Sequence, residues 1–183
     1  MLERFTQPAI GEQPRRFNVA PGQQASVITD EVQQLRWGML SPWRGHGGVR
    51  PPPIRIARLD QISSTPVLAK AKRCIVAGDG WYARGKVGKN LHAWWLQSNA
   101  QGFAGVWTTH ADDSVPSFAV IVQPSPGRSE LLPCGADERW ILDGTTSALT
   151  WRDVEVSRYF ENEAHDDPQC IAPLSNPNQG SLF

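Results

Sequence analysis

The sequence has few cysteines, no long apolar run and no net charge. Its 183 residues include three widely spaced cysteines and no C-x-x-C pair, which predicts free thiols in a reducing compartment. The longest purely apolar stretches, 74–77 and 118–122, are far shorter than the roughly 20 residues of a membrane helix, so no membrane span is expected. Lys plus Arg and Asp plus Glu number 18 each, which excludes nucleic-acid binding by bulk charge but not by a local basic groove.

Signals for export, metal binding and nucleotide binding are also missing. The N-terminal residues form neither a basic nor an apolar segment, so a cytoplasmic location is expected. The four histidines are scattered, and none lies at a zinc-type spacing from a cysteine or carboxylate. The stretch 78–80 lacks the later glycine and the Lys-Ser/Thr pair of a phosphate loop. The sequence therefore predicts neither a metal nor a cofactor.

Glycine and proline are abundant, at 16 and 15 residues, or about 17% together against roughly 12% on average. Short elements are therefore expected, with helix only at 60–72, mainly from Pro66 onward, and at 136–142, where Gly144 is the stop. The pattern predicts an α+β, mostly β domain over 1–164, a bent sheet or open barrel with short flanking helices. Residues 165–183, rich in Asp, Pro, Asn and Ser, predict an extended or partly disordered tail. The β-like segments are 17–20, 25–29, 35–39, 54–58, 74–78, 91–96, 103–108 and 118–123.

Three segments are the most informative: R-F-N-V-A-P-G at 16–22, W-G-M-L-S-P-W at 37–43 and A-G-D-G-W-Y at 77–82. In order and spacing they resemble the SRAP family, the SOS-response-associated peptidases, whose members show N-V-A-P, W-G-l-x-P-x-W and a-D-G-[WF]-[YF]-E-W. Weaker matches are 4–7, 56–60, 103–107 and 156–158, so the resemblance covers essentially the whole chain.

The resemblance implies a bent β-structure with a positively charged cleft for single-stranded DNA around the N-terminus. In the family, removal of the initiator Met exposes a Cys at position two. Its α-amine condenses with the aldehyde of an abasic sugar, and its thiol then closes a thiazolidine. A Glu after D-G-W-[YF] and the His of H-x-R-M-P are the acid and base partners.

This sequence departs from the family at each of these chemical positions. Leu2 replaces the Cys and disfavours removal of Met1, and Ala83 replaces the Glu. The H-x-R-M-P region is shortened to 124–131, around Ser125, and has no His. We therefore predict no catalytic residue and at most residual binding of single-stranded or abasic DNA. The alternative is a protein-interaction or structural module that has lost DNA binding. New chemistry at Cys74 or Cys134 is a third hypothesis.

Five residues are predicted to contact DNA. Trp43 follows Ser41-Pro42 and precedes a Gly-rich loop, so an exposed ring there can stack on an unpaired base. The other four are carried over from the family's motifs: Arg4, Asn18, Arg58 and Arg128. For Asn18 the alternative is a turn-setting role, and for the arginines it is simple solvation. Trp37, Trp81 and Trp107 lie in apolar strand contexts and are predicted to be core.

Overall fold

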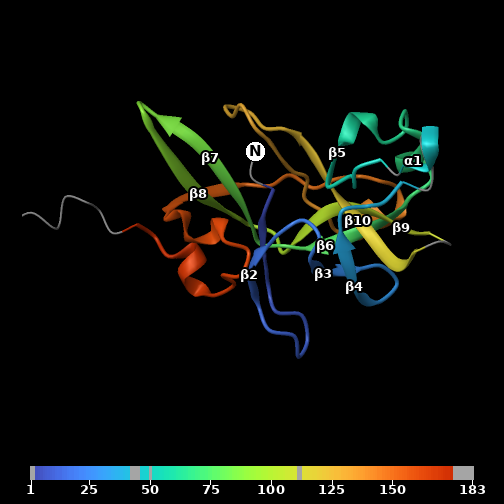
Figure 1. Cartoon of the computed structure of the whole chain (residues 1–183), viewed down its shortest axis with the longest axis horizontal. Coiled ribbons are helices and arrows are strands. Elements are labelled where there is room, and N and C mark those ends of the chain that lie inside the picture. The colour runs from blue at the N-terminus through green and yellow to red at the C-terminus, as the bar shows by residue number, and fades with distance from the viewer. Residues whose placement is uncertain (1–2, 42–45, 50, 111–112, 175–183) are drawn as a thin grey trace, which may run out of the picture.

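The computed structural model describes residues 3–41, 46–49, 51–110 and 113–174, and its strands form two sheets (Figure 1). The strands are β1 (Phe5–Gln7), β2 (Arg16–Val19), β3 (Gln24–Ile28), β4 (Val32–Trp37), β5 (Ile56–Arg58), β6 (Lys72–Ala77), β7 (Gly80–Val87), β8 (Asn90–Ser98), β9 (Gly102–His110), β10 (Asp113–Pro124), β11 (Leu131–Pro133) and β12 (Trp151–Val156). The helical segments are η1 (His46–Gly48), η2 (Leu59–Gln61), α1 (Pro66–Ala69), α2 (Glu138–Leu142), η3 (Arg158–Glu161) and η4 (Pro168–Ile171). The predicted mostly β, α+β class is confirmed.

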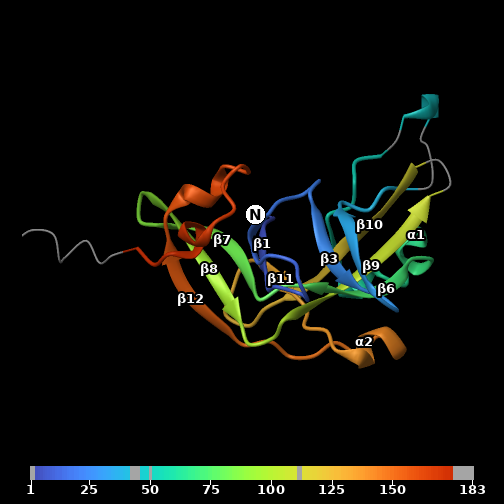
Figure 2. The same cartoon turned by 90° about the horizontal axis from the view of Figure 1, so that it is seen from below.

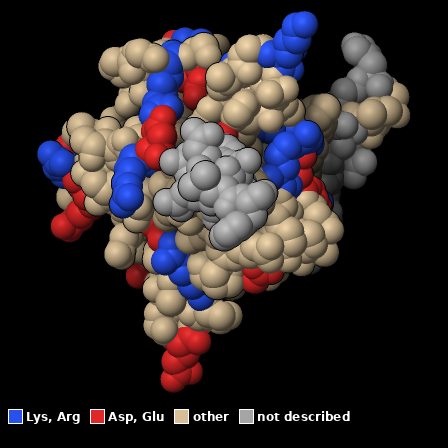
Figure 3. Space-filling model, turned by 90° about the vertical axis from the view of Figure 1, so that its left-hand side faces the viewer, with Lys and Arg blue, Asp and Glu red and all other residues tan. Residues whose placement is uncertain are grey.

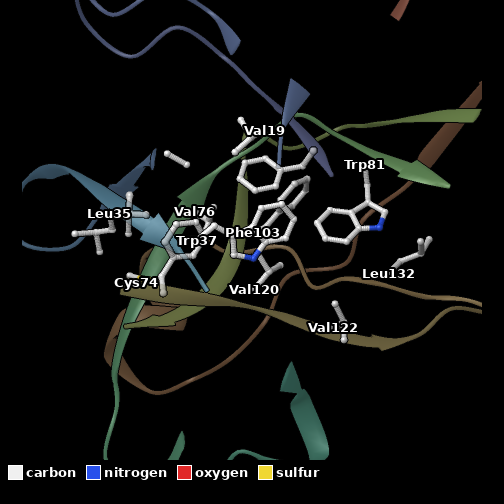
Figure 4. Packing of buried hydrophobic residues seen from close by; sticks show 14 of the residues in the cluster. Val19, Leu35, Trp37, Cys74, Val76, Trp81, Phe103, Val120, Val122 and Leu132 are labelled. Carbon is white, nitrogen blue, oxygen red and sulfur yellow. The ribbon is translucent and has the colours of Figure 1, made fainter. Parts of the chain in front are cut away.

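Five strands of the larger sheet close into a barrel. Strand β10 pairs in parallel with β4 and antiparallel with β9, and β3 and β6 complete the ring between them. Alternation along β10 explains its position, because Phe118, Val120 and Val122 face the barrel interior whereas Ala119 and Ile121 face the helices. Trp37, Trp81 and Phe103 fill the interior and are fully buried (Figure 4). The prediction that Trp37 and Trp81 are core is confirmed, whereas Trp107 is only half-buried at the edge of this hydrophobic cluster.

The second sheet has the order β12-β8-β7-β1-β2. Its β7–β8 hairpin lies at one end of the molecule, together with the C-terminal segment, residues 157–174, which contains η3 and η4. Helices α1 and α2 lie at the other end (Figure 2). The C-terminal segment packs on this sheet through Phe160, whose ring stacks on Tyr82 with 4.0 Å between centroids. Both of these side chains are fully buried, so the segment is part of the core.

The helices are shorter than the sequence predicted. The region 60–72 forms only η2 and α1, because β6 already begins at Lys72. Helix α2 begins after Asp137, whose side chain caps it, and ends before Gly144, which has a φ of 86°. No helix among the described residues is long and apolar enough to cross a membrane.

The start of the predicted tail differs from expectation. Residues 165–174 are packed against the domain: the Asp166 carboxylate pairs with Arg16 and accepts hydrogen bonds from the backbone N–H groups of Phe17 (2.6 Å) and Asn18 (2.9 Å). Cys170 is fully buried in the same cluster as Phe160. The composition of this segment is that of a solvated end, but its carboxylate satisfies backbone donors of β2 and thereby holds it in place.

Candidate functional site

A surface trough lies between the β7–β8 hairpin and the turn that joins β10 to β11. In the β7–β8 register Ala83 lies opposite Trp94, and Gly85 lies opposite His92, so these four residues share one face of the sheet. The small residues on β7 leave a hollow beside the larger rings on β8. Two adjoining hollows of about 270 and 290 Å³ form the trough, lined by Trp81, Ala83, Arg84, Gly85, Trp94, Asp153 and residues 127–130.

The N-terminal strand leads to this trough. Phe5 lies opposite Trp81 in the β1–β7 pairing, and the Tyr82 N–H donates to the Arg4 carbonyl (3.0 Å). The same antiparallel register places Glu3 beside Ala83. The trough is therefore where the resemblance to the SRAP family expects the N-terminal chemistry. On the β7 wall, however, the expected carboxylate is replaced by a methyl group.

Glu130 is a carboxylate of the trough that sequence reasoning missed. Glu130 and Leu132 are two residues apart in the chain, and so are Ala83 and Trp81 on β7. Leu132 packs with Trp81 in the core, and Glu130 lines the trough with Ala83. The Ser129 hydroxyl donates to the Glu130 carboxylate (3.2 Å). Trp81 Nε1 is buried and has no hydrogen-bond partner. The described lining of the trough thus has two carboxylates, Glu130 and Asp153, and an unpaired Trp81 N–H, but no histidine or cysteine.

The arginines of the trough are paired with acidic residues. Arg84 contacts the Glu161 carboxylate at 3.3 Å, and Arg128 contacts Asp153 at 2.5 Å and Glu130 at 3.9 Å. On the face shown in Figure 3, which includes the β7–β8 end, basic and acidic side chains are interspersed outside the grey area. Local charges are therefore largely compensated, and a binding strand would have to compete with these carboxylates for the arginines.

Arg4 and Asn18 meet beneath the C-terminal segment. Asn18 is fully buried; its Oδ1 accepts from Arg4 Nη1 (3.1 Å), and its Nδ2 donates to the carbonyls of Phe160 (2.8 Å), Asn162 (3.1 Å) and His165 (2.8 Å). Arg4, 6% exposed, also contacts the Glu161 carbonyl (3.1 Å) and the Glu163 carboxylate (3.3 Å), and burial lowers its pKa. Any contact of these two residues with DNA would require this network to open.

The remaining predicted DNA contacts do not join Arg4 and Asn18. Arg58, on β5, makes a two-pronged contact with Asp60 (2.7 and 3.0 Å), which raises the pKa of the arginine and lowers that of the carboxyl. Arg128 lies in the β10–β11 turn, and Trp43 lies outside the described residues. Among the described residues, the structure thus brings together only Arg4 and Asn18 of the predicted set.

Trp94 is the aromatic residue of the trough that sequence reasoning passed over. It is half-buried, lines the trough and stacks with His92 at 5.9 Å between centroids. His92 in turn contacts the Glu155 carboxylate. The sequence signal was the alternation of β8, since His92, Trp94 and Leu96 fall on one face. This face can be assigned to the trough only through the pairing with Ala83 and Gly85.

The cysteines offer no nucleophile. All three are buried and free, and burial raises the pKa of the Cys74 and Cys170 thiols and raises that of Cys134 to about 12. Thiols in such surroundings stay protonated and unreactive at neutral pH. Groups of His, Cys, Asp and Glu that could hold a metal ion are absent from the described part of the chain.

Comparisons with known proteins give a family and a fold. A family model described as SOS response associated peptidase (SRAP) matches residues 1–132. A crystal structure of a Bacteroides thetaiotaomicron protein is similar with a TM-score of 0.66 and 17% identity, covering 85% of this chain and 84% of that one. A phage-related protein of Bordetella bronchiseptica has a TM-score of 0.56 and 17% identity, covering 72% and 76% of the two chains. Another protein of that organism has a TM-score of 0.55 and 14% identity, covering 93% and 89%. The search of curated proteins finds no match.

Proposed function

The chain belongs to the SOS response associated peptidase (SRAP) family, and from this premise we propose that it is a non-catalytic member with weak affinity for single-stranded DNA. Family membership associates it with the SOS response. The observation that supports the loss of catalysis is the composition of the trough. Ala83 supplies no acid or base, no histidine is among the described residues that line the trough, and position two is Leu2.

The first experiment tests catalysis directly. The protein is incubated with a single-stranded oligonucleotide that contains one abasic site, and the mixture is run on a denaturing gel without borohydride. We expect no heat-stable shifted band, because an α-amine alone forms only a hydrolysable imine. A stable band from the unmodified protein would overturn the proposal.

Variants sharpen this test. Leu2→Cys restores the thiol but not the acid and base help, which is worth about 10²–10⁴-fold in rate. We therefore expect a faint adduct from Leu2→Cys alone and a stronger one from Leu2→Cys with Ala83→Glu. Adding Glu130→Gln to Leu2→Cys tests whether Glu130 takes over the role of the missing carboxylate. In that case the faint adduct of Leu2→Cys disappears. Equal, strong adducts from both Cys variants would show that the missing carboxylate on β7 is not limiting.

DNA binding is the second part of the proposal, and Trp94, the half-buried aromatic residue of the trough, is the candidate for stacking on a base. A base stacked on an aromatic ring contributes about 1–3 kcal/mol. Trp94→Ala should therefore weaken binding of a fluorescent oligonucleotide, measured by anisotropy, by about fivefold or more. Trp151→Ala is the matched control, because Trp151 lies on β12 and does not line the trough. Trp43→Ala tests the predicted loop contact in the same assay.

The salt dependence tests whether phosphates are contacted. Each phosphate contact on a single strand contributes about 0.7 to the slope of log K against log salt, and two to four contacts are expected. The alternative function, an interaction module without DNA binding, is favoured by the pairing of Arg84 and Arg128 with carboxylates. Binding that is undetectable, or that is unaffected by salt and by both tryptophan variants, would support this alternative.

A further inference from the structure

A separate hollow is lined by residues of α1, α2 and the barrel. These two helices lie at the opposite end of the molecule from the β7–β8 hairpin (Figure 2). We call it the α1–α2 pocket. It has a volume of about 410 Å³ and shares no lining residue with the trough. Ligand sites typically have volumes of about 300–1,000 Å³, so the hollow can take a small molecule.

The inner part of the α1–α2 pocket is apolar. Val106 of β9 comes from the barrel wall, Leu68 and Ile62 come from α1 and the turn before it, and Ile141 comes from α2. These four side chains belong to the cluster that packs the helices against the outside of the barrel. An apolar ligand placed against them would remove its own surface from water at a gain of about 25 cal/mol per Å².

Two basic side chains line the same pocket, and each lies against a tryptophan. Lys72 Nζ lies 5.3 Å from the centre of the Trp107 ring, which also lines the pocket. Arg73 Cζ lies 5.6 Å from the Trp140 ring, and Arg73 Nη1 donates to the Ile141 carbonyl (3.5 Å). Such cation–π contacts hold the Lys72 ammonium and the Arg73 guanidinium close to the faces of these two rings.

Among the described residues, Lys72 and Arg73 differ from the arginines of the trough in making no direct ion pair. In the part of the chain that the structure describes, no ion pair involves Lys72 or Arg73. A hydrogen bond from Thr145 and, to a lesser degree, the charge of Arg73 lower the pKa of the Asp143 carboxyl at the end of α2, but Asp143 is not within ion-pair distance of Arg73. Asp30, in the turn between β3 and β4, is the one carboxylate among the described residues that line the pocket. The described lining thus combines apolar side chains with two basic residues and one acidic residue.

We propose that the α1–α2 pocket binds small amphipathic carboxylates. The apolar body of the ligand lies against Val106, Leu68 and Ile141, and its carboxylate pairs with Lys72 and Arg73. A guanidinium presents its N–H groups as a planar fork that matches a carboxylate, which makes Arg73 the stronger contact. A cationic ligand would be repelled by Lys72 and Arg73, and a neutral ligand would form no ion pair with either side chain.

The test uses three probes with one apolar body: naphthalene-1-carboxylate, naphthalene-1-carboxamide and 1-naphthylmethylamine. Binding is followed by the backbone amide shifts of the full-length protein in a ¹⁵N-labelled NMR titration. We expect the carboxylate to bind about threefold to fivefold more tightly than the amide, as for one exposed ion pair, and the amine to bind least. The shifts should centre on residues 68–73, 106–107 and 141.

Variants separate the charge contact from the apolar contact. Lys72→Gln and Arg73→Gln are at exposed positions and should each remove much of the preference for the carboxylate over the amide. Ile141→Ala should weaken the carboxylate and the amide alike. Arg152→Gln, an exposed arginine on β12, is the matched control and should change nothing.

Two results would overturn the proposal. One is equal affinity for carboxylate and amide, and the other is a preference that survives Lys72→Gln and Arg73→Gln together. Trp94→Ala leaves this pocket intact and should not alter the titration. Because DNA binding depends on the trough and not on this pocket, failure of either proposal is distinguishable from failure of the other.

Discussion

Replacing Asn18 with alanine should destabilise the protein strongly, because Asn18 links strand β2 to the C-terminal segment. Its side chain is fully buried and makes four hydrogen bonds, to Arg4 and to the carbonyls of Phe160, Asn162 and His165. These carbonyls lie more than 140 residues away in the sequence. One side chain therefore holds together two distant parts of the chain.

The magnitude follows from the groups that the substitution would leave without a partner. Two carbonyls at 2.8 Å and one Arg4 N–H lose their contact, and each unsatisfied buried group costs about 1–3 kcal/mol. The lower end of this range gives a loss of about 3 kcal/mol in the free energy of unfolding. For a protein of this size that corresponds to a fall in Tm of about 6–12 °C. Asn18→Asp should be at least as harmful, since it places an oxygen against three carbonyl oxygens without changing the volume.

The measurement is urea unfolding followed by far-UV circular dichroism. Asn99→Ala is the matched control, because Asn99 is exposed and accepts a single hydrogen bond from the Thr150 N–H (2.9 Å). Asn99→Ala should lower the free energy of unfolding by about 1 kcal/mol or less. If Asn18→Ala is no more destabilising than Asn99→Ala, Asn18 does not have the structural role assigned to it.

Three further predictions concern the same end of the molecule and the thiols. Arg158 and Arg84 hold the pKa of the Glu161 carboxyl below its usual value, so this group stabilises the fold above about pH 4.3 and less as the pH falls further. Stability against pH should therefore fall less steeply in acid for Glu161→Gln, and parallel profiles would argue against this contribution. Asp166→Ala should lower the free energy of unfolding by about 2 kcal/mol, measured by urea titration, since two backbone N–H groups lose their acceptor. An aromatic disulfide reagent at pH 8 should label no cysteine in the native protein and three after denaturation, because burial raises the pKa of each thiol; rapid labelling of the native protein would revive the hypothesis of a reactive cysteine.

The local sequence was sufficient for the class of fold and for the family. Alternating apolar residues and frequent glycine and proline predicted short strands, since these signals act within a few residues. The helix at 60–72 was overestimated, because the pairing of β6 with β9 takes over at Lys72. Such strand pairing is a tertiary interaction, and helix propensity is too weak to resist it. The closure of β10 on both β4 and β9 has no local signal either.

The sequence by itself determined which groups the site lacks: Leu2 and Ala83 cannot supply the family's thiol or carboxylate, whatever the fold. Only the tertiary structure decided which groups are present. It brings Glu130 to the trough opposite Ala83, places Trp94 on the same face, and turns Arg4 and Asn18 inward under the C-terminal segment. The physical reason is that the identity of a side chain is fixed by its codon, whereas its burial and its partners depend on contacts between residues far apart in the chain.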